Sequence, residues 1–123
     1  MAIEAPTLLS DLAHGRSGDK GNHANIAVIA YTPAGYAWLR KNLTAEVVRQ
    51  YFERFGPSRV ERYEAANLLA LNFVLYDVLA GGASRSLRSD TQGKTLALAL
   101  LRMPLERPEN IAALRRPAAG DAG

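Results

Sequence analysis

The spacing of apolar and polar residues along the chain predicts a small domain that mixes strands and helices. Apolar residues alternate with polar ones over residues 7–13, and a nearly continuous β-branched run covers residues 25–31, so we expect a strand in each place. Charged residues alternate imperfectly with apolar ones over residues 58–64, which predicts a half-exposed strand. A weaker pattern over residues 83–89 predicts a last strand.

Threonines mark the starts of two predicted helices. Thr32 precedes Pro33, which is the arrangement of an N-cap residue followed by proline at the first helical position, so a helix is expected over residues 33–41. Thr44 begins a second helix, which Gly56 ends. The apolar residues of this second helix recur at every fourth position, namely Leu43, Val47, Tyr51 and Phe55.

The second half of the chain predicts two more helices and a tail. Leucines at helical spacing indicate a helix over residues 68–79, and a short last helix is expected over residues 94–101. Prolines and small residues dominate the C-terminal end, so we expect one domain over residues 1–105 and a flexible tail over residues 106–123. Strands and helices in this order predict an α/β or α+β sandwich of two layers.

Composition excludes several classes of protein. A chain of 123 residues suits one domain, and the absence of cysteine excludes disulfides, cysteine nucleophiles and thiolate-bound metal. The net charge of +3 is dispersed along the chain rather than concentrated, so we expect no nucleic-acid partner. No secretory signal is visible, and Asn67, Asn72 and Asp77 interrupt the longest apolar segment. We therefore expect a cytoplasmic protein that does not bind membranes.

The polar, glycine-rich segment over residues 14–24 is the outstanding feature of the sequence. We interpret it as a long loop in which Gly15, Gly18 and Gly21 let backbone N–H groups approach an anion closely. Arg16 and Lys20 would add charge-assisted contacts. A phosphate-binding loop of the nucleotide-binding type is excluded because a strand follows instead of a helix. A solvated hairpin loop is the other interpretation, and both stay open.

Two further chemistries are conceivable within this segment. His14, Asp19 and His23 carry groups that can bind a divalent metal, but their spacing is not that of a known metal site, and we expect no metal and no cofactor. Ser17 could act as a nucleophile with a histidine as base, although such groups normally converge from different elements. His14, Asp19 and His23 are also our candidate catalytic residues.

Candidate ligand-binding residues extend beyond this segment. Asn72 is expected on a largely buried helix, where its amide would need partners and could anchor the loop. Arg85 could join Arg16 around an anion. The complete set of predicted ligand-binding residues is Gly15, Arg16, Ser17, Gly18, Asp19, Lys20, Gly21, Asn22, Asn25, Asn72 and Arg85.

Several blocks of the sequence resemble one known family, the AtuA-like ferredoxin-fold domain. The most distinctive block is Arg16-Ser-Gly-Asp-Lys-Gly-Asn22, and the resemblance extends from Leu8 to Met103. Further matching blocks follow it in order, namely Trp38-Leu-Arg40, Val60-Glu-Arg-Tyr63, Leu71-Asn-Phe-Val-Leu75 and Gly81-Gly-Ala-Ser-Arg-Ser-Leu-Arg88. In that family the domain is the C-terminal part of acyclic-terpene-utilisation proteins or a separate small chain.

The resemblance implies a fold and a role. The fold would be a ferredoxin-like α+β sandwich of two layers, with helices packed on one face of a small sheet and no iron–sulfur cluster. The role would be that of an accessory subunit that partners a large AtuA-type chain in the catabolism of terpenoid or branched-chain acyl-CoA, with an acyl-CoA or another anion as ligand and possible homo-oligomers. One alternative is a self-contained hydratase or hydrolase of small acyl substrates with His14 or His23 as general base, and another is a purely structural oligomerisation module.

Overall fold

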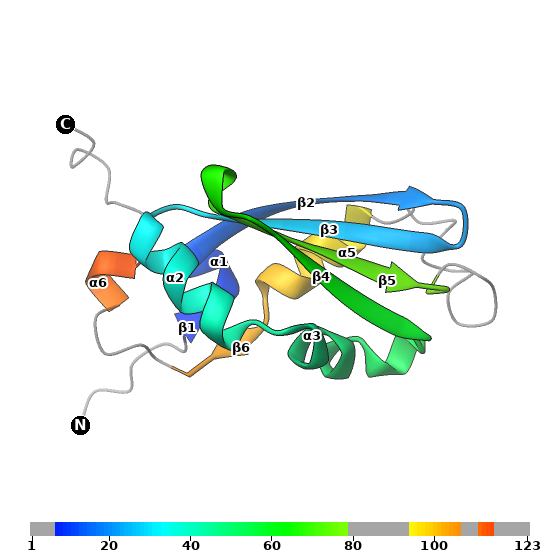
Figure 1. Ribbon diagram of the computed structural model, residues 1–123. Helices are drawn as coiled ribbons and strands as arrows, with labels where there is room; N and C mark the ends of the chain where they lie inside the picture. The colour runs from blue at the N-terminus through cyan, green and yellow to red at the C-terminus, as the bar shows by residue number, and fades with distance from the viewer. Residues whose placement is uncertain (1–6, 79–93, 107–110, 115–123) are drawn as a thin grey trace, which may run out of the picture.

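A four-stranded antiparallel sheet forms the centre of the molecule (Figure 1). The computed structural model describes residues 7–78, 94–106 and 111–114. The strands lie in the order β2-β3-β5-β4, with β2 and β4 at the edges. Their bounds are Ala13–Lys20 for β2, His23–Ala30 for β3, Arg59–Ala65 for β4 and Ala70–Tyr76 for β5.

The longer helices gather on one side of this sheet, so the expected two-layer α+β arrangement is confirmed (Figure 1). They are α2 (Pro33–Asn42), α3 (Ala45–Tyr51) and α5 (Lys94–Leu101). The shorter elements are α1 (Leu9–Leu12), the 3₁₀ turns η1 (Glu53–Phe55) and η2 (Ala66–Leu68), α6 (Ile111–Leu114), and the pair of β1 (Thr7–Leu8) with β6 (Pro104–Leu105).

The connection between β3 and β4 defines the topology. Both strands pair antiparallel with β5, so they run parallel to one another with β5 between them. The helices α2 and α3 connect them, which makes a split βαβ unit. This unit is a hallmark of ferredoxin-like sandwiches, and here the hairpin of β2 and β3 comes first in the chain.

The glycine-rich segment is a strand, and its prediction as a long loop was wrong. All eight residues of β2 pair with β3, from Ala13 opposite Ala30 to Lys20 opposite His23. Only Gly21 and Asn22 remain as the hairpin turn. Gly21 has a φ of 65°, which the type II′ turn requires at its first central position. The dipeptide Gly-Asn between Lys20 and His23 was the sequence signal for this hairpin.

Two other predictions of secondary structure were wrong. The helix predicted over residues 68–79 is the strand β5, because Leu71, Phe73 and Leu75 alternate with period two and all face the core. The strand predicted over residues 7–13 contains only β1, followed by the one-turn helix α1, which buries both of its leucines. Short apolar runs fit both periods, and long-range pairing decides between them.

The helix starts were predicted correctly. The Thr32 hydroxyl accepts a hydrogen bond from the Gly35 N–H at 2.9 Å, and Thr44 does the same for Val47 at 3.1 Å. The second helix ends earlier than expected, at Tyr51, and the 3₁₀ turn η1 completes the segment. The predicted strand over residues 58–64 and helix over residues 94–101 correspond to β4 and α5.

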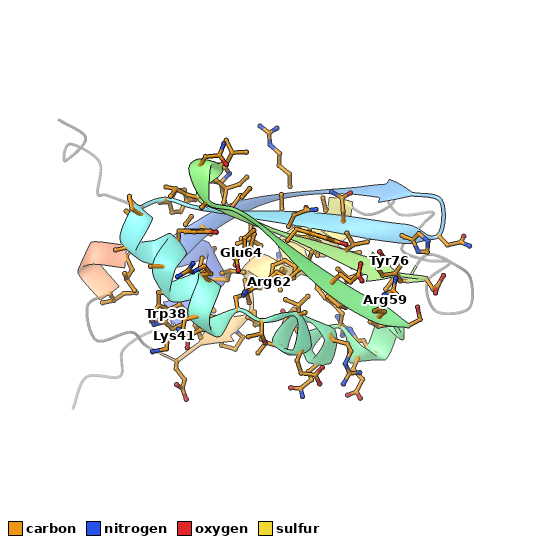
Figure 2. The ribbon with its side chains drawn as sticks, viewed as in Figure 1. Trp38, Lys41, Arg59, Arg62, Glu64 and Tyr76 are labelled. Atoms are coloured by element: carbon orange, nitrogen blue, oxygen red, sulfur yellow. The ribbon has the colours of Figure 1, made fainter. Side chains whose placement is uncertain are left out.

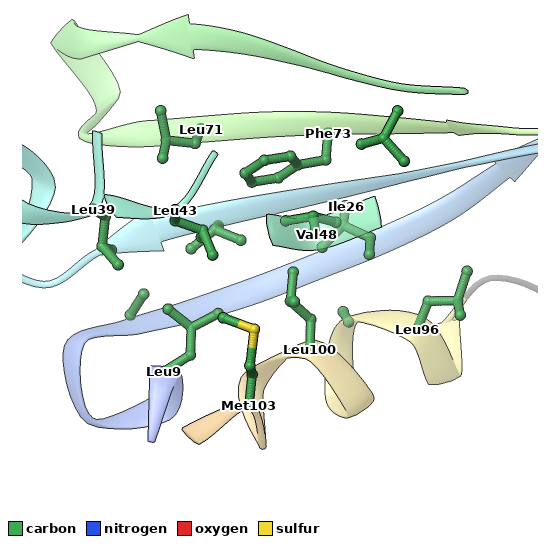
Figure 3. Close-up of a cluster of buried hydrophobic side chains, with 14 of the residues drawn as sticks. Leu9, Ile26, Leu39, Leu43, Val48, Leu71, Phe73, Leu96, Leu100 and Met103 are labelled. Carbon is green, nitrogen blue, oxygen red and sulfur yellow. The ribbon is translucent and has the colours of Figure 1, made fainter. Parts of the chain in front are cut away.

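The hydrophobic core lies between the sheet and the helices (Figure 3). Alternate residues of β3 and β5 point into it, since successive side chains of a strand point to opposite faces and the described helices cover this face. Helices α2, α3 and α5 supply the opposing layer. Fully buried members from both layers include Ile26, Leu39, Leu43, Val48, Leu71, Phe73, Leu96 and Leu100.

The C-terminal segment adds contacts beyond the predicted domain boundary at residue 105. Leu114 of α6 is buried, and its carbonyl accepts a hydrogen bond from the Thr32 hydroxyl at 3.2 Å. Gly35 allows this approach, since a Cβ there would lie 2.8 Å from the same carbonyl oxygen. The predicted strand over residues 83–89 and the candidate Arg85 lie outside the described residues. No helix in the described part of the chain has the length and apolarity needed to cross a membrane.

Candidate functional site

The side chains of β2 alternate between the two faces of the sheet. Ser17 lies opposite Ile26 and therefore points toward the helices, since Ile26 belongs to the core. Arg16 lies opposite Ala27 and points to the helix-free side, as does His14 opposite Ile29. The predicted ligand-binding segment is thus divided between two faces and does not converge on one point.

A cleft lies where the edge strand β2 meets α5. Its volume is about 290 Å³, and three of its lining residues are predicted ligand-binding residues. The lining consists of Gly15, Arg16, Ser17, Ala97 and Leu98. Leu98 is exposed and gives this cleft an apolar surface, while Arg16, which is also exposed, leaves the edge strand β2 on the helix-free side.

Gly15 and Ser17 hold α5 against β2. The Ala97 N–H donates a hydrogen bond to the Ser17 hydroxyl at 3.2 Å. A Cβ on Gly15 would lie 3.2 Å from the Ala27 carbonyl oxygen of β3, which is tight, and 3.7 Å from Leu101 of α5, which is an ordinary contact, so a side chain larger than a methyl group would press on the helix. Both residues therefore shape the cleft, independently of any ligand.

The two histidines lie at opposite ends of the hairpin. His14 is in register with Ile29 and His23 with Lys20, a separation of six residues along β3, or about 20 Å. One metal ion cannot bind both side chains, and the described residues contain no cluster of three potential metal ligands. Ser17 points to the other face of the sheet from His14, so the Ser–His pairing considered from the sequence does not form.

His23 is held by Asp77 at the far end of β5. The Asp77 N–H donates to Nδ1 of His23 at 2.9 Å, and the Asp77 carboxylate lies 3.8 Å from the same nitrogen. A neutral imidazole that accepts at Nδ1 carries its proton on Nε2. His23 therefore presents a donor at Nε2 and has its basic lone pair in use, which argues against a general-base role in this arrangement.

The remaining predicted residues fall in three places. Asn72 lies on β5 and not on a helix, in a row with Ala27 and Arg16 across the helix-free face. Asn25 is opposite Gly18 on the same face, and a Cβ on Gly18 would meet its Oδ1 at 3.4 Å. The other members are in the last part of the hairpin, namely Asp19, Lys20, Gly21 and Asn22.

A polar network on β4 and β5 was missed by the sequence analysis. The carboxylate oxygen Oε1 of Glu61 accepts hydrogen bonds from the hydroxyls of Tyr63 and Tyr76, each at 2.7 Å. The Arg59 guanidinium lies 3.5 Å from the other carboxylate oxygen and 4.2 Å above the ring of Tyr76 (Figure 2). Alternation over residues 58–64 predicted the strand, but the contribution of Tyr76 needed the register of β5.

These hydrogen bonds fix the protonation of the network. Donation from Tyr76 and Tyr63 lowers the pKa of Glu61, so the carboxylate stays ionised. The hydrogen bond that Tyr63 donates to the Glu61 carboxylate raises the pKa of the Tyr63 phenol to about 12, so the phenol stays neutral. The side chains of Arg59, Glu61, Tyr63 and Tyr76 thus already interact with one another on the surface of the single chain.

Arg62, from the same strand, has a structural role on the other face. Its Nη1 donates to the carbonyls of Arg40 at 2.8 Å and Leu43 at 2.9 Å, at the C-terminal end of α2. Its Nη2 lies 3.2 Å from the carboxylate of Glu64 (Figure 2). Arg62 therefore satisfies helix carbonyls that lack partners within the helix.

The fold and the hairpin define an α+β sandwich built on a split βαβ unit, as in ferredoxin-like domains. The family model of the AtuA ferredoxin-like domain matches residues 7–106, and the chain belongs to this family. The suspected relationship and the ferredoxin-like fold are thereby confirmed. Neither the curated proteins nor the solved structures yield a significant match to the chain.

Proposed function

We propose that this chain is a small accessory subunit that works with a large AtuA-type chain in the cytoplasm. The complex would act on acyl-CoA thioesters of terpenoid or branched-chain acids. Membership of the AtuA ferredoxin-like family supports the association with this chemistry. The observation that carries the proposal is the cleft between β2 and α5, which contains Gly15, Arg16 and Ser17.

The chemistry of the cleft suits part of an acyl-CoA. Leu98, with 59% of its surface exposed, offers an apolar contact for an acyl chain, and the long side chain of Arg16 would bend round the edge of the sheet to offer its guanidinium to a carboxylate or phosphate at the cleft. A volume of about 290 Å³ is just below the range of about 300–1,000 Å³ that small-molecule sites usually have. A cleft this small is consistent with a binding site to which a second chain adds further lining residues.

We prefer an accessory role to a self-contained hydratase or hydrolase because of the histidines. His23 uses Nδ1 to accept the Asp77 N–H, and His14 stacks on Tyr31 with ring centroids 5.5 Å apart. A general base needs a lone pair directed at the substrate and commonly a group that orients the ring. Catalytic groups would then come from the large chain.

Coenzyme A binding to the complex tests the cleft. Arg16→Ala should weaken the affinity about tenfold, as expected for the loss of a charge-assisted hydrogen bond, while Arg54→Ala, an exposed arginine on η1, should not. Isothermal titration calorimetry at fixed salt compares the two variants. Equal affinities for both variants and the unchanged protein would contradict the assignment of Arg16.

A further inference from the structure

Asp77, the residue that follows β5, has a backbone conformation that residues with a side chain adopt only rarely. Its φ is 65°, in the left-handed region, which aspartate tolerates better than most residues but at a cost in free energy. Such a conformation persists where the surrounding contacts hold it. Val78, the next residue, is fully buried in the core, so the turn at Asp77 places a core side chain.

Contacts from the two strands beside β5 hold Asp77. Its N–H donates a hydrogen bond to Nδ1 of His23, the first residue of β3, at 2.9 Å. Its carboxylate oxygen Oδ2 accepts a hydrogen bond from the hydroxyl of Ser58, the residue before β4. The other carboxylate oxygen, Oδ1, lies 3.8 Å from the same Nδ1 of His23, which is too long for a hydrogen bond. The turn is thus fixed to both neighbouring strands.

The contact with His23 depends on the protonation of the imidazole ring. Imidazole side chains change charge between about pH 5 and about pH 8, and a protonated ring is a donor at both nitrogens and accepts at neither. A proton on Nδ1 would face the Asp77 N–H, so two donors would meet and the hydrogen bond would be lost. A shift of about 1 Å brings Oδ1 of Asp77 from 3.8 Å to the distance of a charge-assisted hydrogen bond with Nδ1–H. Asp77 therefore offers a donor to the neutral ring and an acceptor to the charged ring.

We propose that His23 and Asp77 form a pH-sensitive clamp at this end of the sheet. Neutral His23 accepts the Asp77 N–H and keeps the turn in its left-handed conformation. Protonated His23 instead donates to the Asp77 carboxylate, which frees the N–H, releases the turn and loosens the position of Val78. Solvent supplies the proton to Nδ1, since 40% of the His23 side chain is exposed. This inference is independent of the proposed acyl-CoA role.

Groups from three strands surround the His23 ring. Tyr76 of β5 contacts the ring edge-on, with ring centroids 4.9 Å apart. The Arg59 guanidinium of β4 lies 4.2 Å above the Tyr76 ring (Figure 2), and Lys20 of β2 is opposite His23 in the register of the sheet. Among the described residues, Asp77 is the one acid that pairs with the ring. The positive charge that His23 gains is therefore drawn toward the Asp77 carboxylate.

Amide NMR of the full chain between pH 8 and pH 5 tests the clamp without any ligand. The Asp77 amide proton should move upfield as the pH falls, with the same midpoint as the ring signals of His23. Exchange of this amide with water, corrected for its intrinsic pH dependence, should be at least about fivefold faster at the low-pH end, as expected for the loss of one hydrogen bond.

Two substitutions separate the clamp from a general effect of acid. His23→Asn keeps an acceptor oxygen near the position of Nδ1 but does not titrate, so the Asp77 amide should stay in its high-pH state throughout. His14→Gln removes the only other histidine in the sequence and is the matched control, in which the response of Asp77 should be unchanged.

The outcomes decide the proposal in each case. An Asp77 amide signal that stays constant between pH 8 and pH 5 overturns it. A response that persists in His23→Asn, or one that disappears in His14→Gln, places the titrating group elsewhere and overturns it too. If His23→Asn does not fold by circular dichroism, the unchanged chain and His14→Gln still decide: an Asp77 midpoint that differs from that of the His23 ring overturns the clamp.

Discussion

The Ala97 N–H donates a hydrogen bond of 3.2 Å to the hydroxyl of Ser17, which joins the first half of α5 to the edge strand β2. The two residues are 80 positions apart in the chain. This contact gives a residue of the distinctive glycine-rich segment a structural role. It also forms one wall of the proposed ligand cleft.

Ser17→Ala should lower the free energy of unfolding by about 1 kcal/mol, since the Ala97 N–H loses its acceptor. Urea denaturation followed by circular dichroism measures the change. Ser17→Thr keeps the hydroxyl and is the control for loss of the acceptor. A fully stable Ser17→Ala chain would show that this hydrogen bond does not support the fold.

Gly15 and Gly18 should respond differently to an added side chain. Gly15→Val should destabilise the chain by about 1–3 kcal/mol, because its Cβ would press on the Ala27 carbonyl and its γ carbons on α5. Gly18→Ala meets only Asn25 Oδ1 at 3.4 Å and should change the stability by less than about 1 kcal/mol. Thermal and urea denaturation compare them. Equal losses would contradict the close approach of α5 at Gly15.

His23 should be in one neutral tautomer, with its proton on Nε2. The reason is the hydrogen bond that its Nδ1 accepts from the Asp77 N–H at 2.9 Å. Nitrogen-15 NMR of the histidine ring above pH 8 distinguishes Nδ1–H from Nε2–H directly. A dominant Nδ1–H form would remove the objection to His23 as a general base.

Tyr63 should titrate about two pH units above an ordinary tyrosine. Its pKa is raised from 10.0 to about 12 because its hydroxyl donates to the Glu61 carboxylate. The raised folded-state pKa means that this contribution to stability is complete below pH 10 and is lost as the pH rises through 12. In absorbance titrations at alkaline pH, Tyr63→Phe should remove one phenol with a pKa of about 12, and Glu61→Gln should move the pKa of the Tyr63 phenol toward 10.0. If the phenol removed by Tyr63→Phe is one with a pKa near 10.0, the network is contradicted.

Helices were easier to predict from this sequence than strands. Thr32 and Thr44 mark the starts of their helices, because each accepts a capping hydrogen bond from a backbone N–H only three residues away. The strand β5 has no such local marker. Its leucines also fit a helical period, and only pairing with β3 and β4 selects the strand.

The candidate site was only partly visible in the sequence. Gly15, Arg16 and Ser17 do line a cleft, so that part of the set lies together. Asn25 and Asn72 lie on the helix-free face instead, because the segment is a strand whose side chains alternate. The contact of Ser17 with Ala97 depends on tertiary packing, and the contact of Glu61 with Tyr76 depends on the register of β4 with β5, which no local pattern carries.

Reconstitution with a large AtuA-type chain from the same host tests the central claim most directly. The tagged chain is co-expressed with the large chain, purified and examined by native mass spectrometry, and each preparation is assayed with an acyl-CoA. The accessory role predicts a stoichiometric complex that turns over the acyl-CoA, while this chain alone is inactive. A chain that binds no large partner and turns over an acyl-CoA by itself would contradict the role.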